Sequence, residues 1–586
     1  MAISTESFLD ILEAARKGEL QLPEFQREYI WRRSQVIELF DSLRQRYPIG
    51  ALLFMERNPE VGIEPRPLQG TEEQATGKVP DAFVLDGQQR ITSGLALYYG
   101  LGGSQYYLDL DQLFNLANTH KVDLKDFRTV RAFLEDIDPD DAYCVGRLRR
   151  NDPLALLAKH LLFTGVLHDA ESTREAIRKY VKLFPERSEF VDIVIRDEFR
   201  IGSDVYVPVT KVEKNRPVEA VSRIFATLNT TGQPLNSFEL VVALLYPSNI
   251  RLRTEIREMR ELAPHYANMD KSGEIFLQTI AMLAGKSPKK SQLPKTVRAE
   301  VYLQRRNEAL EVLEELGKFL TLRLGVGLDQ SPQLIPYDSI FPPMALALQY
   351  LEGMKLKGAD RAKAENKLEK WFVAAALSKR YQEGVHNKQT KDLEECIAWL
   401  NGHSSEPSWI ADFRIPRLTS DTPDGAVGKL LRCMINTRTP KDPISGNDVG
   451  ERPSAVVSSK HHIFPTRWVN TYLQGWDAKR DSCDVALNVT TLSQETNVRW
   501  VNVDPANQIS DIIEATASDA AMLSRLAPHF LDGECVAILQ RSPKTKIDFV
   551  EFLAVREALF LKMFESQWGL RSSGAPEDPD ADDGDD

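Results

Sequence analysis

The sequence is poor in cysteine and in long apolar runs, and each shortage excludes a class of protein. Its 586 residues include only five cysteines, and no two of them form a CxxC pair. This scatter excludes a zinc ribbon and a disulfide framework and favours a reducing cytoplasm. No apolar run approaches the roughly 18–20 residues of a membrane span, and the start MAISTESFLD lacks the basic and apolar segments of a secretory signal. We therefore expect a cytoplasmic protein that does not enter a membrane.

The sequence also has fewer basic than acidic residues, and much of the acidic excess lies at its C-terminal end. The formal net charge is −12, and residues 577–586 alone contain seven acids and no base. An acidic total argues against a protein that coats nucleic acid without specificity, although a local basic groove stays compatible with it. Residues 569–586 are rich in Pro, Gly and Asp and are predicted to form a disordered acidic tail that aids solubility.

Length and local patterns predict several domains. A chain of 586 residues is too long for a single core. Residues 1–246 mix helix and strand patterns, residues 247–429 carry long helical patterns, and residues 430–568 return to strands, loops and helices. The sequence therefore predicts an α+β fold that is mostly helical, with an α/β N-terminal domain, an all-helical middle region and a distinct C-terminal domain.

A polar turn follows a short apolar strand in the N-terminal region. The strand AFVL (82–85) runs into DGQQR (86–90), and the next ten residues have a helical pattern. Backbone N–H groups converge at such a junction with the positive end of the helix dipole, which favours phosphate. Gly87 permits close approach, Arg90 can hold phosphate oxygens, and Asp86 could ligate a metal or orient a water. In the alternative interpretation Asp86 only caps the helix and Arg90 is a surface residue.

Two other N-terminal segments carry residues suited to nucleotides. In QREYIW (26–31), aromatic side chains and an arginine could stack on a base and grip a phosphate, or could form a packed corner. In RIFATLNTTGQPL (223–235), Asn229 and the following hydroxyls could hold a phosphate between two helices, or could be plain helix caps. In the QREYIW segment, the candidates for sensing DNA or its modification are Gln26, Arg27, Tyr29 and Trp31.

The strongest chemical signal is KHHIFP (460–465), with Asn488 and Asn497 downstream. Cleavage of a phosphodiester requires a group that takes a proton from water and a divalent metal that holds the phosphate. Imidazole titrates near neutrality and suits the proton acceptor. Successive side chains of a strand point to opposite faces, so one histidine could ligate the metal while the other addresses the water. The alternative is a pair of exposed loop histidines.

The pattern HHIFP followed by N-x8-N resembles the HNH, or ββα-metal, nuclease motif of GmrD-type domains. The usual form of that motif is Asp-His-Ile-x-Pro, and this sequence has His461 in place of the Asp, as nuclease colicins do. The resemblance implies that His462 is the general base and that Asn488 orients its imidazole. It implies a divalent metal on His461 and Asn497, and the nitrogen ligand favours Mn²⁺, Ni²⁺ or Zn²⁺ over Mg²⁺.

The N-terminal region resembles GmrS-type domains, whose four ordered motifs appear here as LPEFQREYIW, YPIG, DGQQR and FATLNTTGQPL. This resemblance implies a ParB/sulfiredoxin-like α/β fold that binds and hydrolyses a nucleoside triphosphate (GTP, UTP or ATP). The residues that it places at the nucleotide are Asp86, Gly87, Gln88, Gln89, Arg90 and Asn229.

Together the two regions resemble single-chain GmrSD-type defence nucleases, which include type IV restriction enzymes, BrxU and the phosphorothioation-associated SspE. This implies an antiphage endonuclease in which nucleotide hydrolysis, responsive to a phosphorothioate backbone or sugar-modified cytosine, gates DNA cleavage. The expected partners are double-stranded DNA, modified or from phage, a nucleoside triphosphate and, as an open alternative, a second copy of the chain. Two other hypotheses stay open, a ParB-like nucleotide switch with an inactive HNH region and a toxin that acts on RNA or nucleotides.

Overall fold

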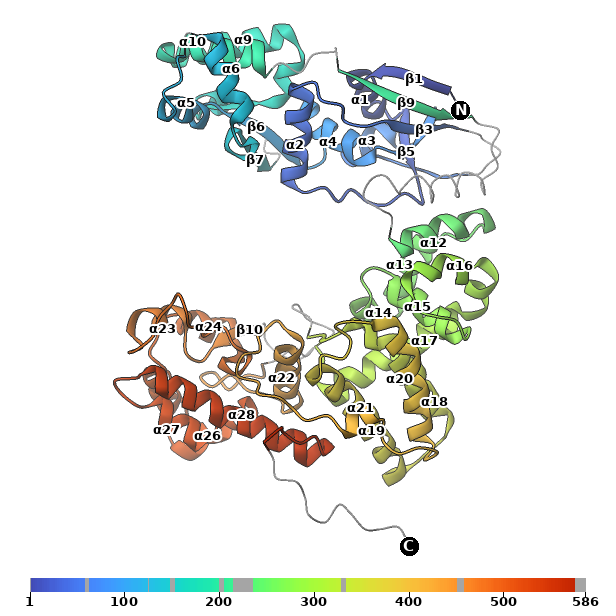
Figure 1. Cartoon of the computed structure of the whole chain (residues 1–586), viewed down its shortest axis with the longest axis vertical. Coiled ribbons are helices and arrows are strands. Elements are labelled where there is room, and N and C mark those ends of the chain that lie inside the picture. Colours follow the sequence, from blue (N-terminus) through green and yellow to red (C-terminus); the bar gives the residue numbers. More distant parts are fainter. Residues whose placement is uncertain are drawn as a thin grey trace. The chain divides into compact units, whose positions relative to one another are not determined.

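The computed structural model describes residues 2–574, apart from 58–62, 125, 148–152, 200–204, 214–235, 328–333 and 450–457. The chain divides into two compact units, Met1–Asn249 and Ile250–Asp586 (Figure 1). The predicted boundary after residue 246 lies close to the boundary between the units, and the predicted helical and C-terminal regions both fall in the second unit.

A six-stranded mixed sheet organises the first unit, in the order β1-β9-β3-β5-β2-β4. The pairs β9–β3 and β5–β2 are parallel, and the other neighbours are antiparallel. The strands are β1 (Ala2–Ser7), β2 (Leu20–Pro23), β3 (Leu52–Glu56), β4 (Pro65–Arg66), β5 (Ala82–Asp86) and β9 (Tyr206–Val212). The helices next to them in the chain are α1 (Phe8–Arg16), α2 (Arg33–Arg44), α3 (Glu72–Ala75), α4 (Gln88–Tyr99) and α12 (Ser237–Leu245).

A second, three-stranded antiparallel sheet has the order β7-β6-β8. Its strands are β6 (Ser104–Asp109), β7 (Tyr143–Arg147) and β8 (Leu161–Phe163). The accompanying helices are α5 (Leu110–Thr119), α6 (Phe127–Asp136), α7 (Pro139–Ala142), α8 (Pro153–Leu157), α9 (Ala170–Leu183), α10 (Ser188–Val191) and a π-helical segment (Asp192–Glu198).

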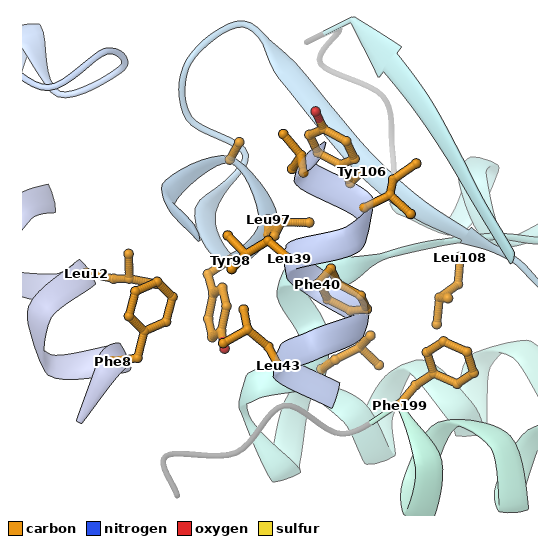
Figure 2. Packing of buried hydrophobic residues seen from close by; sticks show 14 of the residues in the cluster. Phe8, Leu12, Leu39, Phe40, Leu43, Leu97, Tyr98, Tyr106, Leu108 and Phe199 are labelled. Atoms are coloured by element: carbon orange, nitrogen blue, oxygen red, sulfur yellow. The ribbon is translucent and has the colours of Figure 1, made fainter. Parts of the chain in front are cut away.

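One hydrophobic core joins both sheets of the first unit. Phe8 of α1 meets Tyr98 of α4 edge to face, with ring centroids 6.4 Å apart. Figure 2 shows Phe40 of α2 between these residues and Leu108 of β6, with all of these side chains buried. Apolar residues at helical spacing on α1 and α2 therefore place the helices against the strand–turn–helix segment that carries DGQQR.

Helices make up the first part of the second unit, and its described residues from 250 to 437 contain no strand. Periodic apolar positions predict this all-helical character. None of the helices in the described part of the chain is both long and apolar enough to cross a membrane. The helices are α13 (Leu252–Leu262), α14 (Pro264–Met269), α15 (Glu274–Leu283), α16 (Leu293–Thr296), α17 (Ala299–Leu324), α18 (Phe341–Gly353), α19 (Gly358–Leu377), α20 (Val385–Leu400), α21 (Ser408–Ala411) and α22 (Ala426–Thr437).

The C-terminal part of the second unit contains a two-stranded antiparallel sheet of β10 (Ser458–His462) and β11 (Val489–Ser493). The 3-10 turn η8 (Ala486–Asn488) leads directly into β11. The helices are α23 (Thr466–Tyr472), α24 (Gln494–Arg499), α25 (Pro505–Thr516), α26 (Asp519–Leu526), α27 (Gly533–Leu539) and α28 (Lys546–Trp568).

Several expectations differ from the structure or fall outside it. Residues Ala2–Ser7 form strand β1, which was not predicted, and residues 88–90 belong to helix α4 rather than to a turn. Leu570 is buried and Ser572 pairs with Ile415, so packed structure continues past the predicted start of the tail at residue 569. The segment 223–235 with the nucleotide residue Asn229 and the acidic residues 577–586 lie outside the described residues.

Candidate functional site

The HHIFP segment and its two downstream asparagines come together in a strand–strand–helix arrangement. Strand β10 pairs with β11 so that His461 lies opposite Thr490 and His462 lies opposite Val489. Helix α24 begins directly after β11, and the side chain of Ser493 caps it by accepting a hydrogen bond from the N–H of Thr496. The chain thus folds back at once, which returns Asn497 to the strand that carries the histidines.

His461 lies on the buried face of β10, and only 3% of its surface is exposed. Its Nδ1 atom is 2.9 Å from Oδ1 of Asn497, and its Nε2 atom is 3.5 Å from Oε1 of Gln508. Burial lowers the pKa of His461 to about 4, so the imidazole is neutral near pH 7 and one nitrogen keeps a lone pair. A cavity of about 30 Å³ beside it is lined mostly by apolar side chains, with Thr490, Gln508 and His529 among its few polar members.

These residues fit a divalent metal as a partial ligand set. A neutral imidazole and the amide oxygens of Asn497 and Gln508 are all electron-pair donors, and two of them already lie 2.9 Å apart. Within the described ranges, no cluster of three or more His, Cys, Asp or Glu side chains suits a metal. A metal at His461 would therefore have few protein ligands and would leave positions for phosphate and water.

His462 lies on the opposite face of β10, as the alternation of a strand predicts, and its side chain is 23% exposed. Its Nε2 atom is 2.8 Å from Oδ1 of Asp484, in the loop before η8. Sequence reasoning missed Asp484. A single acid in a polar loop 22 residues after the histidine carries no spacing signal that distinguishes it from its neighbours.

Asn488 has different partners from those expected. Its Oδ1 atom accepts from the N–H of Phe464, and its Nδ2 group donates to the carbonyl oxygens of Phe464 and Cys483, at 2.9, 3.1 and 2.9 Å. The resemblance implies that Asn488 orients the imidazole of His462, and in the structure its buried amide binds backbone on both sides. It fixes the chain two residues after His462 and one residue before Asp484.

Asp442 ties the start of α24 to the loop before β10. Its carboxylate accepts hydrogen bonds from the N–H of Ser445, the N–H of Ser493 and the hydroxyl of Thr496, at 2.9, 3.0 and 2.9 Å. Burial opposes ionisation of Asp442, but these hydrogen bonds outweigh it and lower the pKa of the carboxyl group. The charge therefore holds the helix that positions Asn497.

A buried histidine lies behind the strand pair. Nε2–H of His529 donates to the carbonyl of Lys441 at 2.9 Å, and Nδ1 accepts from the hydroxyl of Thr490 at 2.7 Å. The carbonyl can only accept, which assigns the proton to Nε2. Burial lowers the pKa of His529 to about 4.

We expect acid to destabilise the second unit through His529. Its folded-state pKa of about 4 lies below the ordinary histidine value of 6.5, so the unfolded chain binds more protons and stability falls as the pH drops from 6.5 to 4. At about pH 5 the preferential protonation of His529 in the unfolded chain lowers the free energy of unfolding by about 2 kcal/mol. Urea unfolding at about pH 7.5 and about pH 5 should show a smaller pH effect for His529→Gln, whose amide keeps both hydrogen bonds. The exposed control His403→Gln should behave as the wild type, and identical curves for all three proteins would contradict the assignment.

In the first unit, the DGQQR segment forms a tight junction between β5 and α4. Gly87 has φ +100°, and a Cβ atom there would lie 2.2 Å from Cδ2 of Leu52. Oδ1 of Asp86 accepts from the N–H of Gly87 at 2.8 Å, and Oδ2 pairs with Nη2 of Arg90 at 3.2 Å. The side chain of Asp86 stays 51% exposed. A carboxylate and the open N-terminus of α4 thus share one edge of the sheet.

Arg90 joins two of the sequence motifs. Its Nη1 atom donates to the carbonyl of Ile49 at 2.7 Å, and a Cβ atom at Gly50 would lie 2.7 Å from the same nitrogen. Burial lowers the pKa of the guanidinium, although the nearby Asp86 opposes the shift. The YPIG segment therefore packs on the DGQQR junction through its backbone.

The two glutamines of DGQQR are buried, and one of them holds the QREYIW segment. Oε1 of Gln89 accepts from the N–H groups of Ile30 and Trp31 at 2.9 and 3.1 Å, and its Nε2 group donates to the carbonyl of Glu28 at 3.2 Å. Gln89 therefore binds the backbone of the QREYIW segment. The resemblance to GmrS-type domains places it at the nucleotide. Gln88 is likewise buried.

The sensing residues proposed in QREYIW have different environments. Nε2 of Gln26 donates to the carbonyl of Leu85 at 3.2 Å, and the hydroxyls of Tyr29 and Ser93 are 2.9 Å apart. Arg27 and Trp31 are half-buried. The segment is thus hydrogen-bonded to β5 and α4, beside the junction that sequence reasoning assigned to phosphate.

Gly87→Ala should destabilise the first unit by about 2–4 kcal/mol, because a left-handed backbone and a contact with Leu52 combine. Gly77 is the matched control. It has φ +73°, and a Cβ atom at this position would have no other atom within 4 Å, so Gly77→Ala should lose only about 1 kcal/mol through backbone strain. Urea unfolding of both variants measures the difference, and equal losses would show that packing at Gly87 is loose.

Comparison with known proteins adds a family for the first unit. Residues 8–246 match the family described as the GmrSD restriction endonuclease, N-terminal domain. An uncharacterised protein of Methanocaldococcus jannaschii is 24% identical, over 95% of this chain and 98% of its own length. The first unit is thus similar to the N-terminal domain of a restriction endonuclease family. The archaeal relative extends over both units, so the two halves occur together in another protein.

Proposed function

We propose that this chain is a defence endonuclease that cuts DNA at the β10–β11–α24 site under the control of a nucleotide bound by the first unit. The observation that carries the proposal is the convergence of His461 and Asn497 from strand and helix, with His462 on the opposite, partly exposed face of β10. The match of residues 8–246 to a restriction endonuclease family supports it independently.

In this proposal the two histidines divide the chemistry. His462 takes a proton from the attacking water, because a partly exposed imidazole can exchange that proton with solvent. His461 and Asn497 would hold a divalent metal, Mg²⁺, Mn²⁺, Ni²⁺ or Zn²⁺, which would supply Lewis-acid stabilisation of the scissile phosphate. The neutral state of His461 keeps its lone pair available for that ion.

The first unit would bind GTP, UTP or ATP at the β5–α4 junction. The N-terminus of α4 offers backbone N–H groups to phosphate, and the exposed carboxylate of Asp86 can orient a water or a metal. Arg90 would turn from Ile49 toward the phosphates. Gln26, Arg27, Tyr29 and Trp31 would report a phosphorothioate or a sugar-modified cytosine to the junction through Gln89.

The two activities should separate by mutation. His462→Ala should lower single-turnover nicking of supercoiled plasmid at least about 100-fold, because general base catalysis is lost. Its nucleotide hydrolysis should stay within about twofold of the wild type. Arg90→Ala should lose nucleotide hydrolysis instead. Both reactions are measured across a panel of Mg²⁺, Mn²⁺, Ni²⁺ and Zn²⁺.

Wild-type protein that hydrolyses nucleotide but never nicks DNA with any of these metals would favour the ParB-like switch. Loss of both activities in a folded His462→Ala protein would indicate one composite active site rather than two.

A further inference from the structure

An exposed carboxylate is held against the proposed base by a rigid backbone. Oδ1 of Asp484 lies 2.8 Å from Nε2 of His462, although 59% of the Asp484 side chain is open to solvent. Its neighbours on both sides are buried. The carbonyl of Cys483 binds the amide of Asn488 at 2.9 Å, and Ala486 donates its N–H to the carbonyl of Asp421 at 2.6 Å.

The same amide fixes both members of the contact. Asn488 binds the backbone of Phe464, two residues after His462, and the backbone of Cys483, one residue before Asp484. The N–H of Ile463 also donates to the carbonyl of Asn488 at 2.8 Å. The two side chains therefore keep their relative placement because their backbones share one buried anchor, and their contact is not an incidental surface ion pair.

The geometry selects one tautomer of the imidazole. An ionised carboxylate can only accept a hydrogen bond, so a neutral His462 facing Asp484 carries its proton on Nε2. Its lone pair then lies on Nδ1, and Nδ1 is the atom left to take a proton from water. When that proton arrives, the imidazole becomes a cation that the adjacent carboxylate stabilises.

We propose that Asp484 is the positioning residue of the nuclease site, a role that rests on the proposed function and that sequence reasoning gave to Asn488. Asp484 acts through His462 by fixing its tautomer and ring orientation. Asn488 acts one step further back, by holding the two backbone segments together.

The exposed face of β10 supplies an internal control. Lys460 lies two residues before His462 on that face, and its Nζ atom is 2.8 Å from Oδ2 of Asp424. Asp424 is exposed like Asp484 and also neutralises a basic group beside the site. Removal of either carboxylate has the same effect on local charge, but only Asp484 touches the imidazole.

The test compares Asp484→Asn, Asp484→Glu and Asp424→Asn in the full-length protein. Single-turnover nicking of supercoiled plasmid is measured at saturating protein over a range of Mn²⁺, and DNA affinity is measured in EDTA. Asp484→Asn should slow the maximal rate about 10- to 100-fold with DNA affinity equal to or tighter than that of the wild type. Asp484→Glu should recover part of the maximal nicking rate. Asp424→Asn should change the DNA affinity but leave the maximal rate within about twofold of the wild-type value.

Each contrary result has a distinct meaning. An unchanged maximal rate for Asp484→Asn, or an equal loss for Asp424→Asn, would overturn the positioning role. A higher half-saturating Mn²⁺ concentration with the maximal rate unchanged would make Asp484 a metal ligand and would also overturn it. Absence of nicking by the wild-type protein would instead contradict the proposed function.

Discussion

The β10–β11–α24 site depends on a buried cation that is stabilised by carbonyl groups. Arg556 of α28 is fully buried, and its guanidinium donates to the carbonyls of Leu487, Val489, His529 and Phe530 at 2.6, 2.9, 2.8 and 3.3 Å. Burial lowers its pKa to about 10, so it stays charged near pH 7. A buried charge without such hydrogen bonds would destabilise the fold by on the order of several kcal/mol. The bonded carbonyls belong to the residues on either side of Asn488 and to the segment of His529, so the charge locks the strand pair onto α28.

The polar motif residues of both units divide into backbone clamps and solvent-facing groups. Gln89 and Asn488 each place a buried amide across two segments that are distant in sequence, with three hydrogen bonds to backbone. Asp86 and Asp484 keep exposed carboxylates beside these clamps. An amide offers both a donor and an acceptor and carries no charge, which suits it to a buried backbone contact. In DGQQR, burial thus separates Gln89, which binds backbone, from Asp86, which can meet a ligand.

Local sequence patterns predicted most helices and strands, but they did not predict the residues that hold the site in place. Apolar periodicity located β5 and the long helices, and alternation along β10 separated the two histidines. Strand β1 was not predicted, because it lies at a sheet edge and exposes residues such as Ile3. Its sequence therefore contains no apolar run. Asp484 and Arg556 reach their partners through contacts between loops and helix, and neither position carries a periodic signal. The resemblance gave Asn488 an orienting role, and only the structure shows that its amide binds backbone.

Burial also explains how two adjacent histidines can take different roles. His461 faces the protein interior, where desolvation lowers its pKa to about 4 and keeps it neutral, whereas His462 faces solvent and a carboxylate. The related motif has Asp at the position of His461, and an ionised carboxylate on that buried face would need a cation or several donors to be stable. Oδ1 of Asn497, 2.9 Å from Nδ1 of His461, can instead accept the single N–H of a neutral ring. The imidazole therefore lets the strand pair and α24 pack without a charge on that buried face.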